Sequence, residues 1–324
     1  MIKPDLWIPA NNLTLEPNAL TAAKEQHSSL ALTAGPGAGK TEMLAQKADF
    51  LLQTGVCPYP KRILAISFKK DASKNLKDRV QLRCGSNLSR RFDSFTFHAF
   101  AKRIIDKYRV LLTGLDELEP NYSVGMNRIH KKQIDFDSLV PFALQIIHNS
   151  SIARNSILQT YSDVFLDEFQ DCTDKQYELI KAIFHNSNIK LTAVGDTKQR
   201  IMGWAGALDG IFLRFAGDFN AQPLNMYRNF RSKPKLLRLQ NEIIRNLDPN
   251  SVMGEDLIIG DKGSIVHESF NNSSDEAEYL SNLIHTWITE EHILPSEIAI
   301  LVSKQIEYYA LDLITALKAK EIPF

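Results

Sequence analysis

The segment AGPGAGKT, residues 34–41, constrains the fold of this 324-residue sequence more than any other part. It follows an apolar run at 29–33 and precedes residues 42–52, whose leucines and alanines share one helical face. Glycines between a strand and a helix let backbone N–H groups turn inward around phosphates, and the start of the helix adds partial positive charge. The pattern therefore predicts a nucleotide site in which Lys40 reaches the β- and γ-phosphates and Thr41 ligates Mg²⁺.

Composition narrows the class of protein. Lys plus Arg and Asp plus Glu both number 38, so no global basic field attracts nucleic acid, and any such binding must come from a local groove. Three cysteines are too few for a disulfide framework. The N-terminus has no apolar signal segment, and no run approaches the roughly 18 apolar residues that span a bilayer. We therefore expect a cytoplasmic protein with no membrane partner.

Short apolar runs alternate with amphipathic helical patterns through most of the sequence. Strands that are apolar on both faces, with helices between them, predict an α/β fold with a parallel sheet covered on both sides. The expected strands before residue 200 lie at 29–33, 63–68, 162–166 and 189–194. After a polar break at 246–263, we expect strands at 264–270 and 298–302 and helices at 275–288 and 305–318.

A pair of carboxylates supplies the second half of the nucleotide site. Asp167 and Glu168 end the apolar strand at 162–166. At the carboxyl end of that strand, Asp167 can hold Mg²⁺ through water, and Glu168 can orient and polarise the attacking water. An Asp-Glu pair alone is more often a solvated turn, but its position after a buried strand and downstream of the phosphate loop favours the catalytic interpretation.

Around DEFQD at 167–171, the sequence resembles the superfamily 1 DNA helicases of the UvrD, Rep and PcrA type. The likeness is an ordered series of motifs that covers about residues 13–324. The other segments are ILAISFKKDA at 63–72 (motif Ia), TFHAF at 96–100, DFDSL at 135–139, VGDTKQRIMGWAGA at 194–207 (motif III) and YRNFRS at 227–232 (motif IV).

The resemblance implies a P-loop, RecA-like fold and further nucleotide-binding residues. Gln199 would sense the γ-phosphate, Arg231 would contact it, and Phe230, where the family usually has Tyr, would stack on adenine. Glu42 stands next to the loop where several relatives carry Arg, and we count it among the nucleotide-binding positions. The full nucleotide-binding set is Ala34, Gly35, Pro36, Gly37, Ala38, Gly39, Lys40, Thr41, Glu42 and Phe230.

The resemblance also implies a path for single-stranded DNA across the top of the first domain. The expected DNA-binding residues are Ser67, Phe68, Lys69, Phe97, His98 and Trp204. Aromatic faces that stack on bases would let such a motor move along any sequence. For Phe97 and Trp204, plain core packing is the alternative interpretation. Single strands and junctions of single- and double-stranded DNA are the partners that this path predicts.

Departures from the family pattern set the expected domain organisation. Residues 1–221 would form the first RecA-like domain, with a reduced helical insertion at about 110–160, and residues 222–324 the N-terminal part of a second, incomplete RecA-like lobe. The family's motifs V and VI are not found, so the chain looks truncated before them. Asn18 is the nearest candidate for the adenine-reading Gln of the family, and Ala205 replaces an Arg that contacts DNA.

The leading hypothesis is an ATP-dependent DNA helicase or translocase that uses ATP and Mg²⁺, of the 3′–5′ type by resemblance. The alternative is an ATP- and DNA-binding regulatory subunit, without unwinding activity, of a repair or anti-phage defence complex whose partner is a nuclease. A small-molecule kinase is a third hypothesis, but it would leave the matches to the helicase motifs at 194–207 and 227–232 unexplained.

Overall fold

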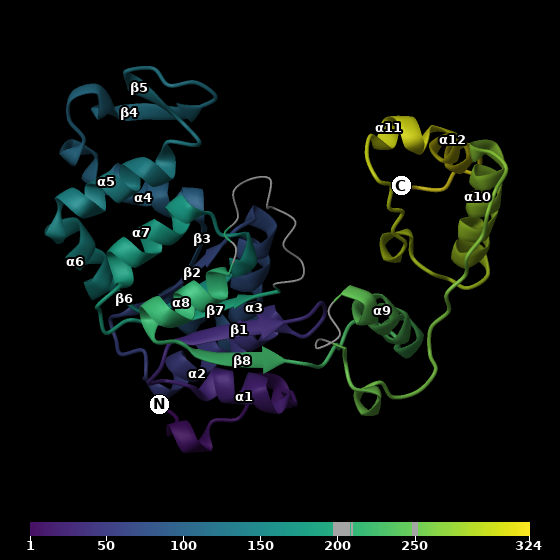
Figure 1. Cartoon of the computed structure of the whole chain (residues 1–324), viewed down its shortest axis with the longest axis horizontal. Helices are drawn as coiled ribbons and strands as arrows, with labels where there is room; N and C mark the ends of the chain where they lie inside the picture. The colour runs from purple at the N-terminus through teal and green to yellow at the C-terminus, as the bar shows by residue number, and fades with distance from the viewer. Residues whose placement is uncertain (197–207, 209, 248–251) are drawn as a thin grey trace. The chain divides into compact units, whose positions relative to one another are not determined.

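The structure is a computed structural model of the whole chain that describes residues 1–196, 208, 210–247 and 252–324. Two compact units make up the chain, residues 1–260 and residues 261–324. Figure 1 shows the helices and strands of both units. Among the described helices, none combines the length and the apolar character needed to cross a membrane.

A six-stranded parallel sheet forms the centre of the first unit, in the order β3-β2-β6-β7-β1-β8. All six strands therefore end at the same edge. The strands are β1 (Leu30–Ala34), β2 (Arg62–Ser67), β3 (Phe92–Thr96), β6 (Tyr161–Asp167), β7 (Lys190–Gly195) and β8 (Gln222–Met226). The expected α/β class with a parallel sheet is confirmed.

Helices cover both faces of this sheet (Figure 1). One face packs against α1 (Pro17–Lys24), α2 (Lys40–Thr54) and α3 (Lys70–Leu88). The other packs against α4 (Phe97–Tyr108), α5 (Leu139–Asn149), α6 (Ser151–Thr160), α7 (Asp174–Phe184) and α8 (Ile211–Phe219). Alternate strand residues feed the two cores: Phe165 faces the first and its neighbours Val164 and Leu166 the second. This alternation is why the central strands are apolar throughout.

The insertion at 110–160 differs from the expected helical one. It begins with a separate two-stranded sheet, β4 (Leu118–Gly125) and β5 (Lys131–Asp135). Helix α5 follows, and its Val140, Phe142 and Ala143 belong to the core on one face of the central sheet. Helix α5 therefore belongs to the domain core, and β4 and β5, which contribute Leu118 and Ile134 to the same core, are the part of this range that forms a separate sheet.

The boundary expected at residue 221 also moves. Strand β8 pairs with β1 along its whole length, from Leu30↔Gln222 to Ala34↔Met226, so it completes the first sheet. Helix α9 (Pro234–Leu247) follows it, and the first compact unit extends to Gly260. Backbone pairing to the neighbouring strand places residues 222–226 in the first domain, although their sequence suggested the start of the second.

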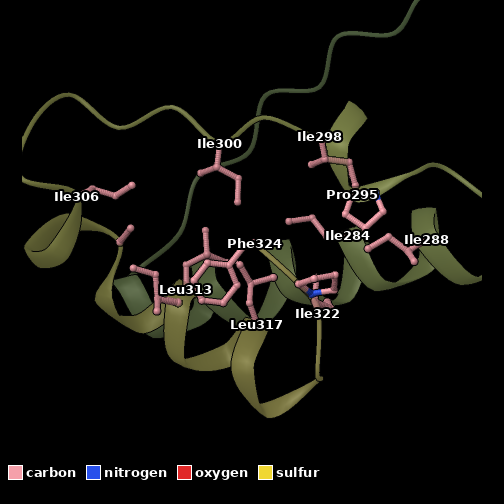
Figure 2. Close-up of a pocket in the computed structure, with 13 residues that line it drawn as sticks. Ile284, Ile288, Pro295, Ile298, Ile300, Ile306, Leu313, Leu317, Ile322 and Phe324 are labelled. Carbon is pink, nitrogen blue, oxygen red and sulfur yellow. The ribbon is translucent and has the colours of Figure 1, made fainter.

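Residues 261–324, all of which are described, form a smaller unit built from α10 (Ser273–Thr289), α11 (Ile306–Tyr309) and α12 (Leu311–Ala319). The strands expected at 264–270 and 298–302 are not formed. A strand requires a neighbour for its backbone N–H and C=O groups, and no strand lies beside either segment in this unit. Apolar side chains of α10, α12 and residues 295–300 line a cavity of about 400 Å³ (Figure 2).

Candidate functional site

The phosphate loop connects β1 to α2 at the carboxyl edge of the sheet. Gly37 and Gly39 have φ angles of 70° and 84°, which side-chain-bearing residues rarely adopt. Helix α2 begins at Lys40, so its first backbone N–H groups point into the loop. The Nζ atom of Lys40 donates to the carbonyl of Ala34 at 3.1 Å, which holds the ammonium at the mouth of the loop. This cradle suits the phosphates of a nucleotide.

Asp167 lies at the end of β6 and points to the same face of the sheet as α2. Its strand neighbour Phe165 packs with α2 and α3, and side chains two residues apart share a face. The pKa of the buried Asp167 carboxyl is raised to about 7, first by burial and then by the charge of Glu168, while the charge of Lys40 acts in the opposite direction. Lys40 follows β1 and Asp167 ends β6, so both lie at the carboxyl edge of the same parallel sheet.

A divalent cation fits this arrangement. The hydroxyl of Ser67, the register partner of Asp167 on β2, is buried without a hydrogen-bond partner among the described residues. Within the described ranges, no three His, Cys, Asp or Glu side chains gather as a metal-binding group. A cation at Asp167 would thus take its other ligands from a hydroxyl, phosphate oxygens and water, which is the usual mode for Mg²⁺. Thr41, the second residue of α2, is the expected hydroxyl.

Glu168 adopts a left-handed backbone conformation with φ 52°. Gln170 Nε2 donates to Glu168 Oε2 at 2.7 Å, and Gln170 Oε1 accepts the backbone N–H of Asp196 at 3.0 Å. The buried Gln170 side chain thus ties the carboxylate to the residue that follows β7. Sequence reasoning assigned Gln170 no role. Its place in DEFQD was the signal, but only the fold reveals its two partners.

The Glu42 carboxylate binds side chains of α2 and α3. Its carboxylate accepts hydrogen bonds from Arg83 at 2.8 and 2.9 Å, from Arg79 at 3.1 Å and from Gln46 at 2.8 Å. Burial alone would raise the pKa of this carboxyl, but the bonds from Arg83 and Gln46 keep it below its ordinary value. Glu42 thereby fastens α2 to α3, and its place among the nucleotide-binding positions stays a prediction.

The segment that leaves β8 lies against the phosphate loop. The backbone N–H of Phe230 donates to the carbonyl of Gly37 at 2.9 Å. A Cβ atom on Gly37 would collide with the side chain of Asn229 and lie 2.8 Å from Arg231 Cβ, so glycine is needed for this approach. The ring of Phe230 borders Gly39 and is 60% exposed. Phe230 and Arg231 therefore lie against the phosphate loop, and their roles in nucleotide binding stay predictions.

The residues expected to bind DNA divide into exposed and buried positions. Lys69 is exposed and Phe68 half-buried at the end of β2, whereas Ser67 is fully buried. Phe97, the first residue of α4, is buried in the core, which matches the alternative interpretation of core packing. Gln199 and Trp204 lie outside the described residues.

The ring of His98 contacts Phe136, an aromatic residue to which sequence reasoning gave no role. Its ring meets that of Phe136 edge-on, with centroids 5.6 Å apart, and Phe136 is 54% exposed. Burial lowers the pKa of His98, while the charge of Asp137 acts in the opposite direction. The position of Phe136 in the DFDSL segment was the available sequence signal.

Comparison with known families gives two matches. The AAA domain family matches residues 18–205, which is more than half of the chain. The UvrD-like helicase C-terminal domain matches residues 224–324.

The sequence is also similar to individual proteins. A probable DNA helicase II homolog of Mycoplasma capricolum is 25% identical over 90% of this chain and 49% of that protein. The ATP-dependent DNA helicase PcrA of Leuconostoc citreum is 24% identical over 86% and 45%, and DNA helicase II of Escherichia coli K12 is 26% identical over 82% and 45%. The chain spans about half the length of these relatives. A crystal structure of the Pif1 helicase from Candida albicans covers 72% of this chain at 16% identity with a TM-score of 0.43.

Proposed function

Because this chain belongs to the UvrD-like helicases of superfamily 1, we propose that it binds and hydrolyses ATP with Mg²⁺ and couples hydrolysis to movement along single-stranded DNA. The observation that carries the proposal is that the phosphate loop, after β1, and the buried Asp167, at the end of β6, lie at the same carboxyl edge of one parallel sheet. A loop that cradles phosphates and a carboxylate for a metal are the two halves that phosphoryl transfer requires.

The chemistry then divides among the residues of the site. The backbone N–H groups of residues 35–41 and the Lys40 ammonium bind the phosphates. Thr41 and Asp167 would hold Mg²⁺, which would neutralise charge on the phosphate oxygens. Glu168 accepts a proton from the attacking water, and the bond from Gln170 holds its carboxylate in place. Arg231 adds a cation from the segment that lies on the loop, where charge develops in the transition state.

DNA would cross the same edge of the sheet. Lys69 offers a cation for the DNA backbone, and the exposed ring of Phe136 beside His98 offers a face on which a base can stack. Phosphate contacts and stacking carry little sequence information, so we expect binding that is indifferent to sequence and that weakens as salt rises. The 3′–5′ direction of movement belongs to the same proposal.

The domain organisation is part of the proposal as well. We assign residues 1–260 to the first RecA-like domain and its exit segment, and residues 261–324 to the start of the second RecA-like lobe. The first assignment rests on the pairing of β8 with β1 and the second on the family match at 224–324.

ATP turnover by the purified protein, with and without an unstructured single strand, tests the proposal. Turnover that rises with the strand and disappears in Lys40→Ala supports it. Partial duplexes with a 3′ or a 5′ tail then report strand separation and its direction. ATP-dependent DNA binding without strand separation on either substrate would favour a regulatory subunit. No ATP binding by the wild-type protein would refute the proposal.

A further inference from the structure

Glu16 is a buried carboxylate with an unusual pair of partners. It lies directly before α1 and is 4% exposed. Its two oxygens accept hydrogen bonds from the backbone N–H groups of Tyr227 at 3.3 Å and Arg228 at 2.9 Å. Burying a carboxylate costs free energy unless hydrogen bonds satisfy both of its oxygens. The two N–H groups provide these bonds, so Glu16 holds this particular stretch of backbone.

Neighbouring polar side chains fix the same stretch as it leaves β8. Asn18 Nδ2 donates to the carbonyl of Asn225 at 2.6 Å, and the Thr33 hydroxyl contacts the Asn225 side chain. The segment is therefore anchored at Asn225 and again two residues later by Glu16.

After the two residues that Glu16 holds, the segment contacts the phosphate loop. The Phe230 N–H reaches the Gly37 carbonyl, while Asn229 Oδ1 accepts the N–H groups of Arg231 at 2.8 Å and Ser232 at 2.9 Å. Asn229 shapes the turn through these hydrogen bonds, and its side chain also packs against Gly37 of the phosphate loop. Among the described side chains that bind this backbone from another element, that of Glu16 binds nearest before Phe230 in the sequence.

The geometry points to Glu16 as a positioning residue for Phe230: it holds the 227–230 backbone so that the Phe230 ring stays beside the loop, where it stacks on the base of the nucleotide. This inference rests on the proposed function, because it takes the ligand of the loop to be ATP. Glu16 acts on the base through Phe230 and leaves the phosphates to Lys40. Removing it therefore weakens the binding of ATP more than the binding of a triphosphate that lacks a base.

The experiment measures the affinities of ATP and of inorganic triphosphate, both with Mg²⁺, for the purified protein. Loss of a base stack costs about 5- to 100-fold in affinity, so we expect Glu16→Ala to weaken ATP binding by about that factor. Triphosphate affinity should stay within about twofold, because the phosphate contacts remain. Glu16→Gln keeps one acceptor oxygen and should fall between Ala and wild type, which also provides a variant if Glu16→Ala does not fold.

Glu25, at the other end of α1, provides a matched control. Its carboxylate also accepts two successive backbone N–H groups, those of His27 at 2.6 Å and Ser28 at 2.8 Å, but these precede β1 rather than follow β8. Glu25→Ala therefore removes the same chemistry from the same helix, and both affinities should stay at the wild-type level.

A double variant tests whether Glu16 acts through Phe230. Once Phe230→Ala has removed the ring, adding Glu16→Ala should change ATP affinity no further, since coupled residues are non-additive. Additive losses, or equal losses of ATP and triphosphate affinity in Glu16→Ala, would overturn the inference. If ATP binding depends on Lys40 while Glu16→Ala has no base-specific effect, the inference fails and the proposed function stands. If wild type binds no ATP, both fail.

Discussion

The side-chain amide of Gln170 donates a hydrogen bond of 2.7 Å to the carboxylate of Glu168, and its oxygen accepts the N–H of Asp196. One buried side chain thus joins the end of β6 to the end of β7. The bond leaves one Glu168 oxygen without a described partner while it fixes the direction of the other. In the proposed reaction, the Glu168 oxygen that Gln170 does not contact faces the attacking water.

Glu168→Gln should keep Mg-ATP binding and slow hydrolysis by about a hundredfold or more. The substitution preserves size and one acceptor oxygen but removes the group that takes the proton from water. Binding of ATP and single-turnover hydrolysis should be measured on the same preparation. If ATP binding itself disappears, the division of roles between Asp167 and Glu168 is wrong.

Lys40→Ala should abolish ATP turnover and leave the fold intact. The Lys40 side chain contacts the carbonyl of Ala34 at the mouth of the loop, not the core, so its loss removes phosphate binding rather than packing. Lys175→Ala, an exposed lysine on α7, is the control and should behave as wild type. Turnover and the thermal unfolding midpoint check both parts, and wild-type turnover in Lys40→Ala would contradict the site assignment.

Stability without nucleotide or metal should fall as pH rises, because of Asp167. Its pKa is about 7 in the folded chain against an ordinary 3.8, so between about pH 4 and 7 the folded state keeps a proton that the unfolded state has lost. The folded state then binds more protons, and the free energy of unfolding decreases through this range and stays low above it.

Asp167→Asn should therefore raise the free energy of unfolding at pH 8, by about 1 to 3 kcal/mol, and change it much less at pH 5. The same variant should lose Mg²⁺-dependent hydrolysis. Urea unfolding at the two pH values is the measurement, with the exposed Asp78→Asn on α3 as control. An equal change at both pH values would show that burial of the charged carboxylate is not the cause.

Phe136→Ala should lower affinity for single-stranded DNA by about 5- to 100-fold and leave ATP affinity unchanged, because it removes a stacking face and no phosphate contact. Tyr59→Ala, another exposed aromatic residue, provides the control. Fluorescence anisotropy with a labelled strand measures both variants. DNA affinity equal to wild type in Phe136→Ala would remove this ring from the proposed DNA path.

Sequence alone predicted those features whose determinants are adjacent in the chain. The phosphate loop and the Asp167–Glu168 pair each lie within a few residues, next to a strand with an unbroken apolar run. Central strands are buried on both faces and therefore carry that run. The two edge strands, β3 and β8, were missed because they are less buried and mix polar with apolar residues, and β8 even includes Pro223.

Apolar runs also led to wrong strand predictions where no neighbouring strand in this unit pairs with them. Residues 264–270 and 298–302 have strand-like sequences, but strand formation requires backbone partners, and this unit provides none to either segment. An apolar pattern reports a preference for burial, whereas pairing is decided by what lies beside it.

The chain's own sequence thus determined the class of fold, the phosphate loop and the carboxylates beside it, because local periodicity and loop chemistry act over short stretches of chain. Tertiary structure decided which distant residues serve that site. Glu42 binds Arg79 and Arg83. Gln170 links Glu168 to Asp196. Glu16 accepts hydrogen bonds from the backbone of residues 227–228. Each of these contacts joins side chains or backbone that only the folded sheet brings together, and no spacing in the sequence encodes them.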